Sequence, residues 1–270
     1  MEVGNRYCSI CGKEKEKKYI SYANISVFIE CECERSARLK KEKADIEFAL
    51  KSAARLRNKS SHLTPIGQKA SFDTMVVDNE NEKGAKGCKY ILNCLLKEQQ
   101  EQTKNSIVLQ GNRGSGKTFL ACAVINDFNS KYPVSELRIK SIIKERDNAF
   151  CEGELTPMQS PCKFITEMDL FALYYDNFNY CKTDGPLQEF KQAQKLLVID
   201  DVGSSNFDSS RIKALYHNIL DYRYSNNLPV IITTNLTKKE LCEYIGERAF
   251  DRLQARSYFI DLTSSKSRRG

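Results

Sequence analysis

Two glycines, a lysine and a threonine near the middle of the chain have the spacing of a phosphate-binding loop. The segment fits G-x-x-x-x-G-K-[ST] at every required position, and its residues are Gly111, Asn112, Arg113, Gly114, Ser115, Gly116, Lys117 and Thr118. Glycine permits backbone conformations in which successive N–H groups surround phosphate oxygens. We expect Lys117 to reach the β- and γ-phosphates and the Thr118 hydroxyl to bind Mg²⁺. The segment therefore predicts a nucleoside triphosphate site.

The flanking residues favour this interpretation over a chance match in a glycine-containing loop. Residues 106–110 form a short apolar run typical of a buried strand, and residues 119–125 continue as an apolar helix. A strand, a loop and a helix in this order place the positive end of the helix dipole beside the phosphates.

Two carboxylates and an amide follow later apolar runs. Residues 196–199 lead into Asp200 and Asp201, and residues 229–234 lead into Asn235. We expect Asp200 to hold the Mg²⁺ shell and Asp201 to orient and polarise the attacking water. We expect the Asn235 amide to meet the γ-phosphate or that water. Together these residues predict hydrolysis of the bound triphosphate.

A short helix predicted over residues 246–253 carries two arginines on one face. Arg248 and Arg252 are four residues apart, which is the spacing of neighbours on a helix surface. In an oligomer, such an arginine would enter the neighbouring site and stabilise charge that develops on the γ-phosphate. The alternative is a surface pair between a glutamate and an arginine of the same helix, which contributes little stability.

Four of the eleven cysteines lie before residue 34, and they form two close pairs separated by a gap. Four thiolates suit a closed, tetrahedral zinc site, and a segment this small needs a metal to compensate for its small core. Unliganded buried cysteines and a redox pair are the alternatives. The remaining seven cysteines are scattered and fit small buried hydrophobic positions. The predicted zinc ligands are Cys8, Cys11, Cys31 and Cys33.

Composition divides the chain into a basic N-terminal part and a nearly neutral remainder. The formal net charge is +7, and residues 1–60 contribute 14 Lys and Arg against 9 Asp and Glu. Residues 34–58 lack glycine and proline and predict a helix that docks on a partner, connects to the ATPase or is merely solvated. One narrow face of this helix is apolar, and its four members are Leu39, Ile46, Leu50 and Ala53. We expect a zinc-binding domain over residues 1–60, a linker over residues 61–70 and an ATPase domain over residues 71–270.

No apolar run approaches the roughly 20 residues that a membrane helix needs, so we expect a cytoplasmic protein without membrane contact.

Residues 131–195 are the hardest part of the sequence to interpret. An insertion over residues 135–160 is expected to contain some helix, and a cluster of aromatic residues follows it. These rings either stack on single-stranded bases or pack in the core. They are Phe171, Tyr174, Tyr175, Phe178 and Tyr180.

The combined motifs resemble the DnaC/DnaI/IstB group of AAA+ ATPases. The resemblance covers residues 64–269 and rests on the phosphate-binding loop, the D-D-x-G sequence that begins at Asp200, the strand that ends at Asn235 and the G-E-R-x-x-D-R-L helix. It implies an α/β fold with an AAA+ P-loop core, in which helices flank a parallel sheet and a lid is minimal or absent. A small N-terminal zinc-binding domain precedes the core in DnaI-type members.

The resemblance also implies a function. Such a protein loads a DnaB-type replicative helicase onto single-stranded DNA during replication initiation, with ATP, Mg²⁺ and Zn²⁺ as cofactors. The zinc domain grips the hexameric helicase, and the ATPase domains self-associate so that Arg252 acts as an arginine finger on a neighbour. Lys266 or Arg268 would be the sensor 2 residue. An IstB-like transposition helper that acts on duplex DNA and a nucleotide-switched adaptor with little turnover are the alternatives.

Overall fold

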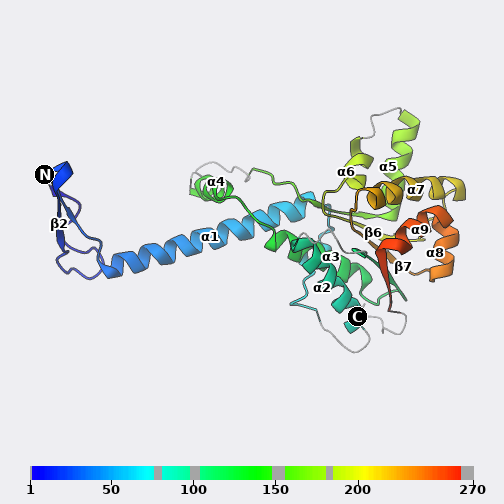
Figure 1. Ribbon diagram of the computed structural model, residues 1–270, viewed down its shortest axis with the longest axis horizontal. Helices are drawn as coiled ribbons and strands as arrows, with labels where there is room; N and C mark the ends of the chain where they lie inside the picture. Colours follow the sequence, from blue (N-terminus) through cyan, green and yellow to red (C-terminus); the bar gives the residue numbers. More distant parts are fainter. Residues whose placement is uncertain (1, 76–80, 98–103, 148–155, 181–184, 263–270) are drawn as a thin grey trace. The chain divides into compact units, whose positions relative to one another are not determined.

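The computed structural model describes residues 2–75, 81–97, 104–147, 156–180 and 185–262 (Figure 1). The chain forms two compact units. The first comprises Met1–Ser52 and Val134–Leu155, and the second comprises Ala53–Pro133 and Thr156–Gly270. The division falls inside helix α1 (Glu32–Ser60). The insertion that we located at residues 135–160 thus contributes mainly to the first unit.

The first unit contains a small sheet in the order β1-β3-β2. Strands β2 (Lys17–Ile20) and β3 (Ile25–Phe28) are antiparallel, joined by a turn at Ser21–Ala23, and β1 (Glu2–Val3) pairs with β3 in parallel. The turn ends at Asn24, whose φ of 51° is in the left-handed region that asparagine tolerates. Within the same unit, Arg146 of α4 (Glu136–Asp147) pairs with Asp45 at 2.9 Å and lies over the Phe48 ring.

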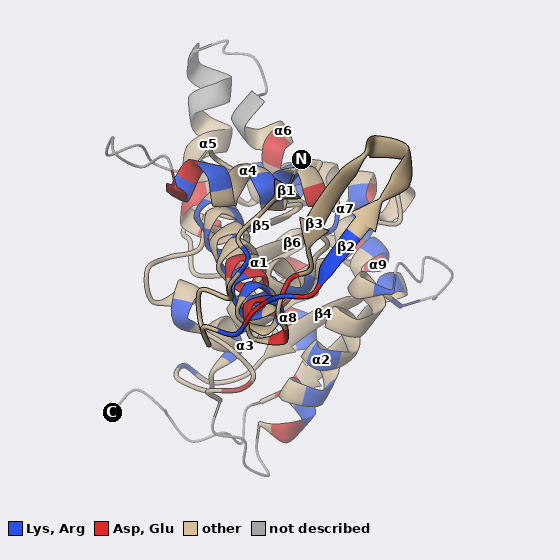
Figure 2. Cartoon of the chain, turned by 90° about the vertical axis from the view of Figure 1, so that its left-hand side faces the viewer, with Lys and Arg blue, Asp and Glu red and all other residues tan. Residues whose placement is uncertain are grey.

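Helix α1 carries alternating charge along much of its length. Figure 2 shows Lys and Arg interleaved with Asp and Glu on this helix. Arg38 bonds to both Glu30 and Glu42, and Lys51 bonds to Glu47. The apolar face that the sequence suggested is mostly solvent-exposed, and only Ala53 of its four members is buried.

The second unit is built on a parallel five-stranded sheet in the order β5-β6-β7-β4-β8. Successive residues of a strand point to opposite faces, and the core follows this alternation. Ile107 and Leu109 join the apolar cluster that contains residues of α2 and α3, whereas Val108 joins the cluster of α5–α9. The strands are β4 (Ser106–Gln110), β5 (Cys162–Thr166), β6 (Leu196–Val202), β7 (Val230–Thr234) and β8 (Ser257–Asp261).

Helices therefore cover both faces of this sheet, as the α/β prediction requires. The first face carries α2 (Glu82–Leu96) and α3 (Lys117–Lys131). The second face carries α5 (Glu167–Tyr180), α6 (Gly185–Lys191), α7 (Ser209–Ser225), α8 (Lys238–Ile245) and α9 (Glu247–Arg256). None of the helices within the described ranges is both long and apolar enough to cross a membrane.

Residues 61–70, which we expected to be a linker, pack within the second unit. Leu63, Gly67 and Ala70 are buried, and the Asn126 side chain donates hydrogen bonds to the carbonyls of Gly67 and Ala70 at 2.8 and 2.7 Å. The Ser61 carbonyl accepts the N–H of Phe164 in the edge strand β5. This segment is therefore part of the packed structure of the second unit.

Arg57, near the end of α1, binds the end of α3. Its guanidinium donates to the carbonyls of Asn129, Tyr132 and Pro133 at 3.2, 2.8 and 2.8 Å, and it lies over the Tyr132 ring. The last carbonyls of a helix lack intrahelical partners, so a cation there satisfies them and the helix dipole together. Only 4% of Arg57 is exposed.

Replacing Arg57 with alanine should destabilise the second unit. Arg57→Ala leaves three carbonyls without their donor, and we expect the free energy of unfolding to fall by about 2 kcal/mol. Urea unfolding followed by near-ultraviolet circular dichroism of the tyrosines measures this change. Arg55→Ala, an exposed arginine one half-turn earlier, should change stability by less than about 0.5 kcal/mol. Equal effects of the two substitutions would contradict the capping role.

Candidate nucleotide-binding site and metal centre

The phosphate-binding loop joins the end of β4 to the start of α3. Its glycines Gly111, Gly114 and Gly116 have φ values of 148°, 82° and 89°. L-residues with side chains avoid these values, which explains why the turn needs glycine at these positions. The strand, loop and helix that the sequence predicted around this motif are all present.

Lys117 is the first residue of α3, and its ammonium group points back into the loop. Nζ donates to the carbonyls of Gly111 and Asn112 at 2.8 Å each and to the Asn235 Oδ1 at 3.0 Å. Lys117 is 5% exposed. The structure therefore brings the predicted lysine and the predicted amide of the β7 end into one site. A phosphate would have to replace some of these oxygen acceptors.

Asp200 lies between two hydroxyl groups that donate to its carboxylate. Thr118 Oγ1 donates to Oδ2 at 3.1 Å, and Thr233 Oγ1 donates to Oδ1 at 2.6 Å. Burial raises the pKa of Asp200 above its ordinary value, because the charged form is desolvated. A bound divalent cation favours that charged form, so the paired Thr118 and Asp200 oxygens fit a Mg²⁺ site.

Asp201 is exposed, unlike the buried residues that precede it in β6. The register between β6 and β7 shifts between Ile199 and Val202, and this irregularity turns Asp201 out of the strand alternation. The residue has a φ of 56°, and its N–H donates to Thr233 Oγ1 at 2.9 Å. Its carboxylate is thus free to face solvent at the edge where the P-loop lies.

Arg252 has partners on α7 and none among the P-loop residues that the structure describes. Its Nε bonds to Asp221 Oδ1 at 3.0 Å, and its guanidinium lies 4.9 Å from the centre of the Tyr224 ring. Arg248, one turn earlier, is exposed. The surface pair with a glutamate of the same helix, which was the alternative interpretation, is not the contact that Arg252 makes.

The aromatic residues of α5 divide between the core and its border. Phe171 is fully buried and packs on Phe207, with ring centroids 4.6 Å apart. Tyr175 also packs on Phe207, and Arg211 lies over the Tyr175 ring. The Phe178 and Tyr180 side chains, and the sensor 2 candidates Lys266 and Arg268, lie outside the described residues.

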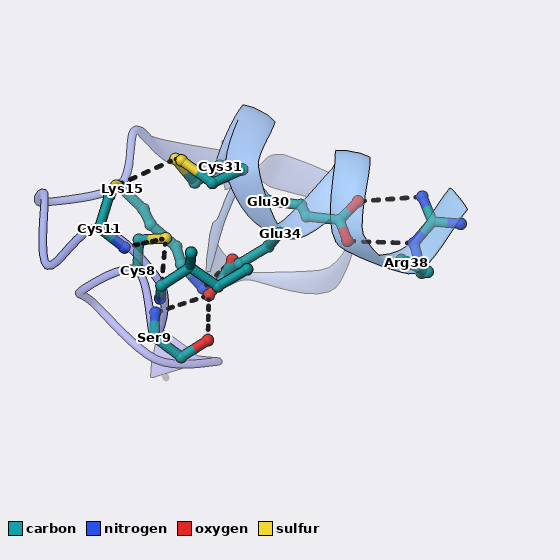
Figure 3. Close-up of polar contacts among 10 residues, drawn as sticks. Cys8, Ser9, Cys11, Lys15, Glu30, Cys31, Glu34 and Arg38 are labelled. Carbon is teal, nitrogen blue, oxygen red and sulfur yellow. Dashed lines mark hydrogen bonds and ion pairs between the residues drawn. The ribbon is translucent and has the colours of Figure 1, made fainter. Parts of the chain in front are cut away.

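The four N-terminal cysteines converge in the first unit, and Figure 3 labels three of them, Cys8, Cys11 and Cys31. All four sulfur atoms lie within 4.8 Å of one another. Cys8 Sγ accepts the N–H groups of Ile10 and Cys11 at 3.4 Å each. Hydrogen bonding with Cys11 and Cys31 raises the pKa of Cys33 to about 12. A thiolate donor set of this size fits a structural zinc site, in which the cation compensates the clustered negative charge.

An ion pair fastens this cluster to the start of α1. Lys15 Nζ lies 2.7 Å from Glu34 Oε2, and Glu34 Oε1 accepts hydrogen bonds from the N–H and hydroxyl of Ser9. The hydrogen bond from Lys15 lowers the pKa of Glu34 to about 2. The two cysteine pairs, which belong to separate segments, are thus held at a fixed distance by contacts that do not involve sulfur.

Most of the described cysteines outside this cluster are buried, as we expected for small hydrophobic side chains. Cys88, Cys94, Cys122 and Cys162 are buried, whereas Cys242 is half-buried. Cys151 and Cys181 lie outside the described residues.

Comparison with known proteins identifies the family. The family described as "ATPase family associated with various cellular activities (AAA)" matches residues 107–258, which is more than half of the chain. The chain belongs to the AAA family of ATPases. The predicted fold class, an α/β core with a parallel sheet flanked by helices, is confirmed.

Individual relatives of this AAA ATPase include proteins of DNA replication. The replicative helicase loader DnaC of Escherichia coli strain K12 is 26% identical over 223 residues, which cover 82% of this chain and 75% of that protein. A crystal structure of DnaI has a TM-score of 0.54 at 19% identity and covers 74% of this chain and 94% of that one. A crystal structure of the DnaC helicase loader has a TM-score of 0.54 at 20% identity, covering 73% and 99%. The predicted resemblance to the DnaC/DnaI group is confirmed.

Two polar residues at the nucleotide edge of this AAA ATPase were not among those predicted from the sequence. Thr233 bonds to both Asp200 and Asp201, and Glu167 binds the loop that follows them. Both stand at the ends of buried strands, Thr233 in β7 and Glu167 directly after β5. A polar residue at the carboxyl end of a predicted parallel strand was the available signal.

Metal content tests the cysteine cluster of the AAA ATPase. We expect about one zinc ion per chain, because four thiolates complete a tetrahedral shell, and we expect Cys8→Ser/Cys33→Ser to lose it. Plasma mass spectrometry of the purified full-length protein measures the zinc content. Cys242→Ser, a change at a half-buried cysteine outside the cluster, is the matched control and should retain the metal. Unchanged zinc in the double variant would exclude a four-thiolate site.

Proposed function

We propose that this AAA ATPase loads a DnaB-type replicative helicase onto single-stranded DNA and hydrolyses ATP at the interfaces between its own subunits. The observation that carries the proposal is the similarity to the helicase loader DnaC, which extends over 82% of the chain. That length exceeds the segment matched by the AAA family as a whole, so the likeness includes more than a generic nucleotide site.

Different residues of the nucleotide site bind the phosphates, hold the metal ion and activate water. The P-loop N–H groups and Lys117 bind the phosphates, and Thr118 with Asp200 hold Mg²⁺. The metal ion supplies charge neutralisation on the phosphate oxygens. Asp201, exposed at the same edge, accepts a proton from the attacking water and orients it, while Asn235 positions the γ-phosphate.

Within its own chain, Arg252 contacts Asp221 and Tyr224. The proposal assigns Arg252 to the neighbouring subunit's ATP. A cation added at the γ-phosphate stabilises charge that develops during hydrolysis. Turnover then depends on assembly, and the free chain hydrolyses slowly.

The unit that contains the cysteine cluster exposes apolar side chains that are suited to docking on another protein. Several of its large apolar side chains are exposed, among them Tyr22 at 93%. Exposed apolar groups concentrated in a small unit indicate a binding surface, since folding leaves them uncovered. We assign this surface to the helicase. Its exposed members include Val3, Tyr7, Ile10, Tyr19, Tyr22 and Ile29.

Mixing two inactive variants tests hydrolysis between subunits. Lys117→Ala should lose ATP binding, and Arg252→Ala should bind ATP but lower kcat by about 10³-fold. Because the first variant retains the finger and the second retains the P-loop, their mixture should recover ATPase activity in a concentration series. Arg248→Ala, one turn away on α9, is the comparison and should retain most activity. No recovery on mixing would contradict a finger that acts in trans.

Capture of a purified hexameric DnaB-type helicase tests the docking surface. Tyr22→Ala in the full-length protein should weaken capture about tenfold, because aromatic anchors dominate protein interfaces. Leu137→Ala, which also removes an exposed apolar side chain but on α4, should leave capture unchanged. Binding kinetics on immobilised helicase measure both. Equal capture by wild type and Tyr22→Ala would refute this assignment of the surface.

A further inference from the structure

The first residue of α5, Glu167, is a fully buried carboxylate outside the residues assigned to nucleotide chemistry. Its Oε2 atom accepts the backbone N–H groups of three consecutive residues. Gly203, Ser204 and Ser205 donate at 3.0, 3.0 and 3.1 Å. Successive N–H groups that converge on one point form an anion-binding nest. The nest directly after the strand that carries Asp200 and Asp201 is therefore filled by a carboxylate of the chain itself.

The nest depends on glycine at its first position. Gly203 has a φ of 90°, which a residue with a side chain adopts only with strain. A Cβ atom there would also lie 2.5 Å from Leu236 Cδ1. Both observations explain why the sequence after the two aspartates contains this glycine.

Two tyrosine hydroxyls complete the surroundings of the carboxylate. Tyr216 of α7 donates to Glu167 Oε1 at 2.7 Å, and Tyr244 of α8 donates to Oε2 at 3.0 Å. The Tyr244 hydroxyl also lies 2.6 Å from Ser205 Oγ. Charge-assisted hydrogen bonds of this kind are among the stronger ones in proteins. Glu167 thus joins α5, α7 and α8 to the loop over residues 203–205.

The same loop fixes the backbone of Asp201. The N–H of Ser204 also reaches the Asp201 carbonyl at 3.2 Å, which closes a turn from Asp201 to Ser204. Asp201 has a positive φ of 56° without being glycine. A residue in this region needs its surroundings to hold it there. The Thr233 hydroxyl accepts the N–H of Asp201 at the start of this turn, and Glu167 accepts the N–H of Ser204 at its end.

We propose that Glu167 is a positioning residue for ATP hydrolysis: its carboxylate fills the nest at residues 203–205 and thereby holds Asp201 where it can orient the attacking water. The inference rests on the proposed role of Asp201. Glu167 acts through the loop and leaves ATP binding to the P-loop. Its loss therefore lowers kcat and leaves the affinity for ATP intact.

The first test compares Glu167→Gln with wild type in the assembled protein. An amide is uncharged and has one acceptor oxygen where the carboxylate has two, so it loses the charge-assisted bonds either to the nest or to the Tyr216 hydroxyl. We expect kcat to fall by about 10- to 100-fold, the loss expected for a misplaced catalytic group, with KM for ATP within about twofold. The matched control is Glu240→Gln in the capping box at the start of α8, where glutamine serves equally well. It should retain the wild-type kcat.

The second test asks whether a free anion replaces the missing carboxylate. Glu167→Ala leaves the nest and the two tyrosine hydroxyls around a vacated position, and formate is small enough to enter it. We expect formate to restore a measurable part of kcat in Glu167→Ala, with no effect on Asp201→Ala. Restoration of activity separates positioning from a general loss of structure.

Hydrogen–deuterium exchange gives a readout that does not need turnover. The N–H groups of residues 203–205 should be protected in wild type and should exchange at least about tenfold faster in Glu167→Ala, since their acceptor is gone. If the wild-type protein hydrolyses no ATP, the proposed function fails, and exchange still decides whether Glu167 anchors the loop. Unchanged protection in Glu167→Ala would overturn the inference.

Two further outcomes would also overturn it. An unchanged kcat in Glu167→Gln would show that the loop needs no anchor, and a KM that rises in parallel with the loss of kcat would show a defect in binding. If both Glu167 variants fail to fold, Tyr216→Phe takes their place. It removes the donor to Oε1 and should lower kcat roughly fivefold at unchanged KM. A wild-type kcat in Tyr216→Phe would then refute the inference.

Discussion

The nucleotide site is organised around the charge of Lys117, which the chain buries at the start of α3. An unpaired buried ammonium group is costly, so it must meet oxygen acceptors even without a ligand. Here the acceptors include two P-loop carbonyls and the Asn235 amide oxygen. They belong to the loop after β4 and the turn after β7, and these strands are neighbours in the sheet. One cation therefore joins the phosphate-binding loop to the turn after β7, and a phosphate that replaced these acceptors would affect both elements together.

Three further buried charged side chains of the second unit form hydrogen bonds with backbone groups. Arg57 meets the last carbonyls of the α3 region, and Glu167 meets the N–H groups after β6. Arg223, 1% exposed, donates to the carbonyls of Lys191, Ala193 and Pro229. Loops and helix ends have backbone groups without regular partners, and a charged side chain satisfies several at once. These three residues fix the irregular segments that border the sheet, while the apolar clusters fix the sheet itself.

This distribution explains which features could be predicted from the sequence. The strands, the P-loop and the family follow from local patterns, since apolar runs and glycine spacing carry them. Glu167 and Arg57 could not be recognised, because a charged residue in a sequence usually indicates a solvated position. The division between the two compact units inside α1 also leaves no local signal, since the helical pattern continues across it without interruption. The contact between Arg146 and Asp45 joins residues about 100 positions apart and leaves no local signal.

The contact that Arg252 makes with Asp221 of its own chain is compatible with a role at the site of a neighbouring subunit. Its partner Asp221 is 43% exposed, as is the arginine itself, and exposed ion pairs contribute little stability. Exchanging Asp221 for a triphosphate in a less solvated interface therefore costs little and gains a stronger Coulomb interaction. Tyr224 meanwhile lies against both Arg252 and Arg256, which restricts the guanidinium before assembly. Since an ordered side chain loses less entropy on binding, this contact would lower the entropic cost of the role that we propose for Arg252 at a neighbouring site.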